Sequence, residues 1–487
     1  MFRDYVFEKS PAQYSNHILL IDNDALYERI DYTAAFSAHG FEMVIYEDDL
    51  KLRIRYQEKI NDKASKLAIV AKSDCYIPYD IHRRLSVFDV SFSRLFPRLN
   101  AAAVKTKTET ELDLLCHVYA QNFDDWKTES ATEQYFREQV FSHPNIQWYL
   151  STKLTSLKEY ANTATGYRDW FAIAEEKAEL DLLAVQNGHE IDSSAINHVF
   201  QEYALREFGQ LSQVIDKESP VLVSKAMEYM HDHSEKFVII VMDGMSEFDW
   251  RIFATSFEDV HYEQAAAFAM IPSTTSISRQ CLLSNKYPSQ LMEPWKQSKE
   301  QSEFVDCAKR LGFSDSQIGY ERGYDASFGS FVRCGAVIIN DVDDMVHAQT
   351  QGKIGMYHDI KLLAGQRKLR DMVQRFLGAG FDVYISADHG NTLCTGLGRL
   401  TGSGVEVETK SHKMVVLKDF ADKAGLIQKY GLIEYPKYYL PKEYDYLICD
   451  VGQSLDIKDE TVMTHGGMSI DEVVVPFIKI KAGKHNG

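Results

Sequence analysis

The stretch Lys236–Gly244, KFVIIVMDG, decides the fold class of this 487-residue chain. Its apolar run has the length of a buried strand, and the Asp-Gly pair that follows is typical of a turn. Helical patterns such as residues 365–380 separate it from further apolar runs: AAAFAMI (265–271), GAVIIND (335–341), FDVYISADHG (381–390), MVVLKD (414–419), DYLICD (445–450) and EVVVPFIKI (472–480). This alternation predicts an α/β domain with a mainly parallel sheet between two layers of helices.

Two further parts are predicted before this sheet. Three short apolar runs, HILLID (17–22), FEMVIYED (41–48) and KLAIVAKSD (66–74), predict a small N-terminal α/β domain, whereas residues 101–235 show helical periodicity. We therefore expect a small α/β domain over 1–100, a helical block over 101–235 and the main domain over 236–487. Asp22 and Asp74 would suit a signalling receiver, but charged residues also simply end strands, and we favour that interpretation.

The composition indicates a folded protein, with 45% hydrophobic and 25% charged residues. A net charge of −18 argues against broad non-specific binding of DNA or RNA, although it leaves room for a local basic groove. The seven scattered cysteines contain no CxxC pair, which indicates reduced thiols rather than disulfides or a thiolate zinc site. Neither a membrane-length apolar run nor a signal peptide is recognisable, so we expect a cytoplasmic protein without a membrane partner.

Carboxylates and imidazoles recur where the predicted strands of the main domain end. Function collects at the carboxyl ends of the strands in such a sheet. The candidate residues are Asp243, the hydroxyl run Ser273–Thr275, Asp343 with His347, Asp388 with His389, and His465 in VMTHGGMS. Each alone has an ordinary explanation as a turn, a chance spacing or a core histidine. Together they form a mixed oxygen and nitrogen set that suits two divalent cations, zinc most naturally and manganese as an alternative.

The segment AMIPSTTSISRQ (269–280) leads from a predicted strand into a predicted helix through several hydroxyl residues. Serine or threonine can simply cap the helix there. A helix N-terminus also favours negative charge, so a hydroxyl at this point can be a nucleophile beside a bound phosphate. Two cations about 3.5–4 Å apart would ionise that hydroxyl and stabilise the attacking and leaving oxygens at phosphorus. One of Ser273, Thr274 and Thr275 is therefore the candidate nucleophile.

These motifs, in the order DGM, PSTTSIS before LLSNKYP, DxxxH, ADHG and THGG, resemble those of the alkaline phosphatase superfamily. Within it, the chain looks like the PglZ domain family of bacterial phage-exclusion systems, over residues 236–481 by motif and more loosely before them. The resemblance implies an alkaline-phosphatase-like fold and makes Thr275 the nucleophile. It also implies that Asp243, Thr275, Asp388 and His389 hold one metal ion, and that Asp343, His347 and His465 hold the other. Asp341 and Asp344 compete with Asp343, and only the DxxxH spacing favours Asp343.

The sequence departs from the family pattern just after the nucleophile. It lacks a clear phosphate-binding arginine of the monoesterase type and the asparagine that related diesterases often carry. Ser278 and Arg279 occupy that neighbourhood and are the candidate substrate contacts, although an arginine in the first turns of a helix more often faces solvent. Monoester, diester and phosphonate hydrolysis therefore stay open.

We expect a two-metal phosphohydrolase, more specifically a phosphodiesterase that acts on a nucleotide or nucleic acid through a phosphothreonine. The preference for diesters comes from the resemblance to a phage-defence family and not from particular residues. The alternatives are a phosphomonoesterase and a non-catalytic, metal-binding scaffold subunit that binds other phage-defence proteins, such as a methyltransferase or an ATPase. An intact Thr275 with a complete ligand set argues against the scaffold.

Overall fold

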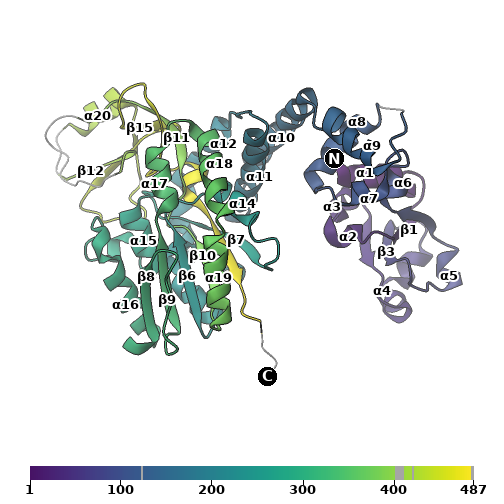
Figure 1. Cartoon of the computed structure of the whole chain (residues 1–487), viewed down its shortest axis with the longest axis horizontal. Helices are drawn as coiled ribbons and strands as arrows, with labels where there is room; N and C mark the ends of the chain where they lie inside the picture. The colour runs from purple at the N-terminus through teal and green to yellow at the C-terminus, as the bar shows by residue number, and fades with distance from the viewer. Residues whose placement is uncertain (122–123, 401–410, 419–421, 484–487) are drawn as a thin grey trace. The chain divides into compact units, whose positions relative to one another are not determined.

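The computed structural model describes residues 1–121, 124–400, 411–418 and 422–483 (Figure 1). The chain forms two compact units, unit 1 over residues 1–151 and unit 2 over residues 152–487. The predicted helical stretch contributes to both of them. Its main helices are α8 (Glu109–Tyr119), α9 (Glu129–Tyr135), α10 (His143–Thr163), α11 (Tyr167–Gln186) and α12 (Ser194–Glu207). The division into three domains at residues 100 and 235 stays a prediction.

Unit 1 contains a four-stranded parallel sheet of order β2-β3-β1-β4. Its strands are β1 (His17–Asp22), β2 (Glu42–Ile45), β3 (Leu67–Lys72) and β4 (Ser86–Val90). The three predicted strands are confirmed, and β4 is additional. Asp22 accepts hydrogen bonds from the backbone N–H groups of Leu26 (2.8 Å) and Tyr27 (2.9 Å), so its carboxylate caps the turn after β1. This contact agrees with the interpretation of Asp22 as a strand-ending residue.

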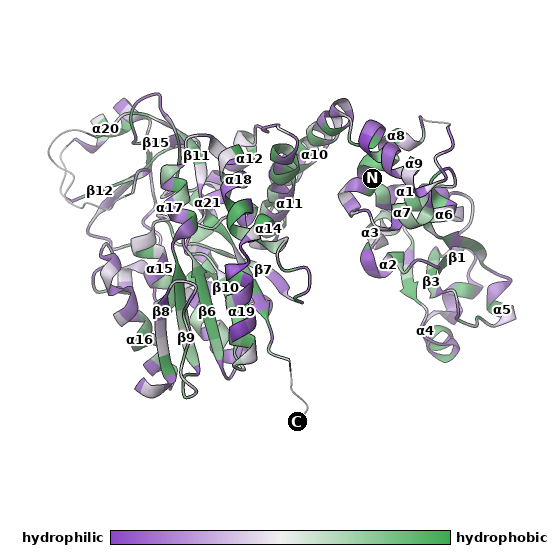
Figure 2. Cartoon of the chain, viewed as in Figure 1, coloured by the Kyte–Doolittle hydropathy of each residue, from purple (hydrophilic) through white to green (hydrophobic). Residues whose placement is uncertain are grey.

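Unit 2 is built on a seven-stranded sheet of order β5-β7-β17-β10-β6-β9-β8. Its strands are β5 (Val221–Leu222), β6 (Phe237–Met242), β7 (Glu263–Phe268), β8 (Ile318–Arg322), β9 (Cys334–Ile339), β10 (Asp382–Ser386) and β17 (Val474–Ile480). Only β17 runs antiparallel to its neighbours within this sheet, so the mainly parallel arrangement is confirmed. All residues of β6 and β9 are buried, and Figure 2 shows both strands as hydrophobic.

Helices cover both faces of this sheet, as the buried strands require. One group contains α11, α14 (Glu247–Ala254), α18 (Gly352–Gly365) and α19 (Lys368–Gly378). Within it, α11, α14 and α18 contact one another, and α19 contacts α18. The other contains α13 (Ala226–His233), α15 (Thr275–Ser284) and α16 (Glu300–Arg310). Figure 1 shows α15 and α16 on one side of the strands and α18 and α19 on the other. Among the described residues, no helix combines the length and the hydropathy needed to cross a bilayer.

Two predicted strands lie outside the main sheet, which corrects the interpretation of MVVLKD and DYLICD. They form β12 (Met414–Leu417) and β14 (Asp445–Ile448), which pair antiparallel with each other in a separate three-stranded sheet that also contains β13 (Ile433–Glu434). Residue 419 of the first run lies outside the described residues. Another small sheet contains β11 (Thr392–Gly396), β15 (Gln453–Ser454) and β16 (Thr461–Thr464). Apolar content alone could not distinguish these strands from those of the main sheet.

The antiparallel β17 explains how a distant segment reaches the edge where the parallel strands end. The carboxyl ends of β6, β7, β9 and β10 lie at one edge, and the amino end of β17 lies at the same edge. The THGG segment and the short helix α21 (Ile470–Val473) precede β17 and therefore enter there. Gly390, in the ADHG turn after β10, donates its backbone N–H to the Glu472 carbonyl (2.9 Å).

The close contact at Gly390 predicts the effect of a single methyl group. A Cβ atom at Gly390 would lie 1.9 Å from the backbone oxygen of Asp471, which no side-chain adjustment can relieve. We therefore expect Gly390→Ala to lower the melting temperature strongly, measured by thermal unfolding with circular dichroism. Gly365→Ala is the matched control, because a Cβ there has no neighbour within 4 Å and alanine is the better helix former. Equal melting temperatures for the two variants would contradict this packing.

Candidate metal centre

Seven of the predicted site residues meet at this edge of the sheet. Asp243 follows β6, Thr275 begins α15 after β7, and Asp388 and His389 follow β10. Asp343 and His347 lie on α17 (Asp341–Ala348) after β9, and His465 follows β16. Two sets have ligand atoms within 4.8 Å of one another: Asp243, Asp388 and His389, here called group 1, and Asp343, His347 and His465, here called group 2.

Group 1 surrounds the hydroxyl of Thr275. Thr275 Oγ1 lies 3.0 Å from His389 Nε2 and 3.4 Å from Asp243 Oδ1. Asp388 Oδ1 accepts the backbone N–H groups of Gly244 (3.3 Å) and His389 (3.1 Å), whereas its Oδ2 is buried without a hydrogen-bond partner. Asp243, Asp388 and His389 are all buried, and Thr275 is half-buried. A hydroxyl, an imidazole nitrogen and two carboxylates therefore converge on one small volume.

Group 2 is the more open of the two. Asp343 Oδ2 lies 3.4 Å from His347 Nε2, and Asp343 Oδ1 lies 3.4 Å from His465 Nε2. His347 is exposed and His465 is buried. Gly244 allows α17 to approach, because its φ of +74° disfavours other residues and a Cβ there would lie 3.3 Å from Asp343 Oδ1. Of the three competing aspartates, Asp343 is therefore the one whose carboxylate lies within the cluster, rather than Asp341 or Asp344.

The two buried histidines have their rings fixed in the same way. His389 Nδ1 lies 3.0 Å from the carbonyl of Gly390, and His465 Nδ1 lies 3.0 Å from the carbonyl of Ser273. A carbonyl can only accept, so Nδ1 carries the proton in both rings and the lone pair of Nε2 faces the carboxylates. Metal-binding histidines usually donate their second ring N–H to such a partner.

Burial and crowding shift the pKa values of these groups strongly. Burial and the charge of Asp388 raise the pKa of Asp243 well above its usual range. Burial opposes ionisation of Asp343 as well, but the hydrogen bond from His347 and the nearby imidazoles of His465 and His389 hold its pKa below the usual range. Burial and the neighbouring His389 lower the pKa of His465, which favours its neutral form. Neutral imidazole is the form that binds a metal ion.

These residues fit divalent cations. Asp343 Oδ1 and Asp388 Oδ2 are buried oxygens without hydrogen-bond partners, and such atoms call for another positive or donating group. Two imidazole lone pairs face the same space. Mixed nitrogen and oxygen ligands without thiolate suit zinc or manganese. Group 1 together with Thr275 could hold one ion, and group 2 could hold another.

The other hydroxyls of the 273–275 run have structural contacts. Ser273 Oγ donates to the Gly467 carbonyl (3.1 Å) and accepts the N–H of Gly466 (3.1 Å), so it ties the THGG segment to the start of α15. Thr274 is the N-cap residue of α15 but makes no side-chain cap hydrogen bond. Of the three candidates, Thr275 is the one whose hydroxyl contacts group 1.

Ser278 and Arg279 do not lie where the sequence predicted them. Ser278 is fully buried and its hydroxyl accepts the N–H of Met270 (2.9 Å), which leaves it no access to a substrate. Arg279 is also fully buried, so it faces neither solvent nor an open phosphate site. Its guanidinium lies 2.5 Å from Asp243 Oδ2, 3.7 Å from Asp388 Oδ2 and 2.6 Å from Glu300 Oε2. Burial of three carboxylates around it explains why this arginine turns inward.

Sequence patterns missed Glu300 and a histidine–aspartate pair near the site, His412 with Asp456. Glu300 orients Arg279 and is held in turn by Arg322 and by the Tyr320 hydroxyl (2.6 Å). His412 Nδ1 lies 2.5 Å from Asp456 Oδ1, and its ring centroid is 6.4 Å from that of His347. No motif spacing connects these residues to the five strand-end motifs, so only the folded chain reveals them.

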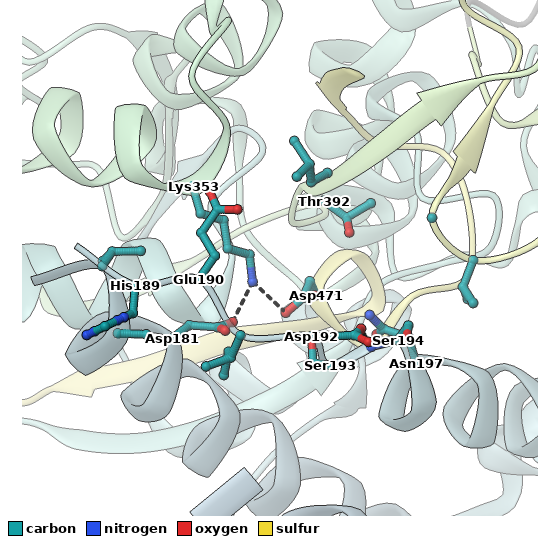
Figure 3. A pocket seen from close by; sticks show the side chains of 16 residues that line it. Asp181, His189, Glu190, Asp192, Ser193, Ser194, Asn197, Lys353, Thr392 and Asp471 are labelled. Carbon is teal, nitrogen blue, oxygen red and sulfur yellow. Dashed lines mark hydrogen bonds and ion pairs between the residues drawn. The ribbon is translucent and has the colours of Figure 1, made fainter. Parts of the chain in front are cut away.

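A separate pocket of about 200 Å³ lies beside the ADHG turn, between α11, α12, α18 and α21 (Figure 3). Figure 3 shows the Lys353 ammonium between Asp181 and Asp471. The buried Lys177 contacts the same two carboxylates, at 2.8 Å and 2.7 Å. Two lysines thus balance two aspartates, and the network anchors α21, whose Asp471 carbonyl abuts Gly390. This ion-pair network, which lies outside the metal centre, therefore supports the ADHG turn.

Comparison with known proteins gives a family match in this part of the chain. Residues 330–480 match the family model of the BREX system PglZ alkaline phosphatase-like domain. No curated protein matches the chain. Among solved structures, murine ectonucleotide pyrophosphatase/phosphodiesterase 5 is 12% identical with a TM-score of 0.36, over 50% of this chain and 88% of that one. Phosphonoacetate hydrolase from Sinorhizobium meliloti 1021, in complex with phosphonoformate, is 11% identical with a TM-score of 0.34, over 52% and 92%.

The family match includes five of the converging residues, namely Asp343, His347, Asp388, His389 and His465. Asp243 and Thr275 precede the matched range and join these residues through the sheet. Over residues 330–480, the resemblance to the PglZ alkaline phosphatase-like domain that the motifs predict is confirmed.

Proposed function

We propose that this protein is a metal-dependent phosphodiesterase that acts on nucleotides or nucleic acid through Thr275 in a bacterial phage-defence system. The observation that carries the proposal is the contact of the Thr275 hydroxyl with His389 Nε2 and Asp243 at the N-terminus of α15. The defence role and the nucleic-acid substrate rest on the description of the matched family as part of the BREX system.

In this proposal Thr275 Oγ1 attacks phosphorus and the bond from phosphorus to the departing ester oxygen breaks. The N-terminus of α15 favours the negative charge of the transferred group. The resulting threonine phosphodiester still carries the second ester group of the substrate, and the first leaves as an alcohol. Water then attacks phosphorus in this intermediate, which releases a phosphate monoester and restores the hydroxyl. Divalent cations bound to the two groups would ionise the hydroxyl and stabilise charge on the phosphoryl oxygens. His389 and Asp243 keep Oγ1 in place for the attack.

Removal of the nucleophile tests the proposed function directly. We expect the wild-type protein, loaded with zinc or manganese, to hydrolyse bis-(4-nitrophenyl) phosphate. Thr275→Ala should lower kcat on the order of 10³-fold or more, because the attacking oxygen is gone while the other ligands remain. Release of 4-nitrophenol gives the rate, and elemental analysis gives the metal content of both proteins.

Thr275→Ser is the matched control, since it keeps the hydroxyl and should retain measurable turnover. The mono-(4-nitrophenyl) ester serves as the second substrate and separates a diesterase from a monoesterase. Undiminished turnover in Thr275→Ala would refute the proposed nucleophile.

The position of Arg279 favours a second candidate function, a non-catalytic metal-binding scaffold. Its permanent positive charge already faces two carboxylates of group 1, at 2.5 Å from Asp243 and 3.7 Å from Asp388. In a scaffold, Arg279 would take the place of the ion at group 1, and a single ion at group 2 would suffice. One bound ion per chain, together with no turnover of either ester or of oligonucleotides, would decide for the scaffold.

Loss of Arg279 should make the fold depend on added metal. Arg279→Met leaves Asp243, Asp388 and Glu300 buried without their shared cation, which we expect to lower the free energy of unfolding by about 3–5 kcal/mol in EDTA. A divalent ion at group 1 would restore part of the missing positive charge. Zinc should therefore raise the melting temperature of Arg279→Met by more than that of the wild type.

Arg206→Met is the control for this experiment. Arg206 forms an exposed ion pair with Glu207, so its loss should change stability by less than about 1 kcal/mol and with no dependence on zinc. An equal zinc response in all three proteins would mean that Arg279 does not face a metal site.

A further inference from the structure

Unit 2 has a second open feature, a groove of about 850 Å³ between two segments that are distant in the sequence. Residues 289–296, which follow α15, form one wall, and residues 437–444, which precede β14, form the other. We call this feature the 289/437 groove. Its lining combines aromatic rings with lysines, unlike the acidic and imidazole lining of the metal centre.

The aromatic residues of the groove are held by the fold and remain partly exposed. Trp295 lies with its ring centroid 6.4 Å from that of Tyr446 on β14, and Tyr444 lies at the same distance from Tyr446. Both Trp295 and Tyr444 are half-buried. Partly exposed aromatic rings on a fixed backbone are the platforms on which unpaired bases stack.

Lysines outnumber acidic residues along the groove. Lys296, Lys437 and Lys442 line it, against Glu293 and Glu443. Lys418 adds a fourth ammonium, which lies 5.9 Å from the centre of the Tyr444 ring. Lys296 pairs with Glu293 (2.5 Å), and Lys437 pairs with Asp445 (2.8 Å). Lys442 and Lys418 are therefore the ammonium groups that complement a phosphate backbone, in a chain with a net charge of −18.

The second wall is held in a conformation that its residues disfavour. Lys437 and Tyr439 both have φ values of 61°, in the left-handed region that side chains other than glycine rarely adopt. Tyr439 fixes this wall, since its hydroxyl donates to the Phe208 carbonyl (2.9 Å) and accepts the N–H of Ser212 (2.9 Å). Backbone strain of this kind is concentrated at binding and catalytic sites.

The first wall is connected to the helix that carries Thr275. Gln280 Nε2 donates to the Pro294 carbonyl (3.2 Å) and the Glu293 carbonyl (3.4 Å). Gln280 lies five residues after Thr275 on α15, which corresponds to about 7.5 Å along the helix axis. The first wall of the groove is therefore attached to the helix that begins with Thr275.

We propose that the 289/437 groove binds single-stranded nucleic acid, with bases stacked on Trp295 and Tyr444 and the phosphate backbone beside Lys442. The binding itself requires only the groove. Delivery of the strand to Thr275 rests on the proposed function.

Fluorescence anisotropy with a labelled oligothymidylate tests the groove, with the full chain in EDTA so that no hydrolysis occurs. Trp295→Ala and Tyr444→Ala should each weaken binding by about tenfold or more, because each removes a stacking surface. Lys442→Glu should lose more affinity relative to the wild type at low salt than at high salt, because one phosphate contact becomes repulsive. For the same reason, its affinity should depend less on the salt concentration than that of the wild type. Lys442 is exposed, so this variant probes binding without disturbing the core.

Matched controls lie elsewhere in unit 2. Phe331→Ala removes an exposed aromatic residue and Lys217→Glu reverses an exposed lysine, and neither residue lines the groove. Both should bind the oligonucleotide like the wild type. Equal affinities for the groove variants and the controls would overturn the proposal, as would tighter binding of a polyglutamate peptide than of the oligonucleotide.

The outcome is separable from that of the proposed function. Groove-dependent binding without ester hydrolysis would refute the phosphodiesterase and leave the groove as a nucleic-acid site. Hydrolysis of the bis ester without groove-dependent binding would refute the groove and leave the enzyme.

Discussion

Compensation of buried negative charge is the constraint on which the rest of this structure depends. Asp243 and Asp388 are buried at one sheet edge beside the largely buried Asp343, and a buried carboxylate without compensation costs several kcal/mol. The chain answers with the guanidinium of Arg279, with backbone N–H groups on Asp388, and with two imidazoles fixed by carbonyls. Asp343 Oδ1 and Asp388 Oδ2 are left without hydrogen-bond partners, which fits the binding of cations at this site.

The same requirement explains the shape of the surrounding network. Glu300 contacts Arg279 on the side away from Asp243 and Asp388, and Glu300 is itself held by Arg322 and Tyr320. This chain of contacts runs from α15 through α16 to β8, so the helix that carries Thr275 is tied to the outermost strand of the sheet. Lys177 and Lys353 anchor α21 in a comparable way beside the ADHG turn. Charge balance therefore fixes the backbone on both sides of the site.

Much of this arrangement could be predicted from the sequence, because apolar strands that are followed by Asp, His or hydroxyl residues report both the fold and the end of the sheet where function collects. The strands that lead to Asp243, Thr275, Asp343 and Asp388 were of this kind. Prediction failed where the outcome depended on partners from distant segments. Arg279 turned inward because Asp243, Asp388 and Glu300 surround it, and Ser278 faces Met270. The runs of β12 and β14 were as apolar as core strands, and only their pairing with each other removed them from the main sheet.

The strands β10 and β17 are neighbours in the sheet, yet residues 387–473 lie between them along the chain. This long excursion contains both small sheets and one wall of the 289/437 groove, and it carries His465 shortly before the chain returns. Insertions and deletions are tolerated best in connections whose ends are already fixed by a rigid scaffold. Relatives could therefore exchange most of this excursion during evolution and acquire new substrates, while the chemistry at the sheet edge stays the same.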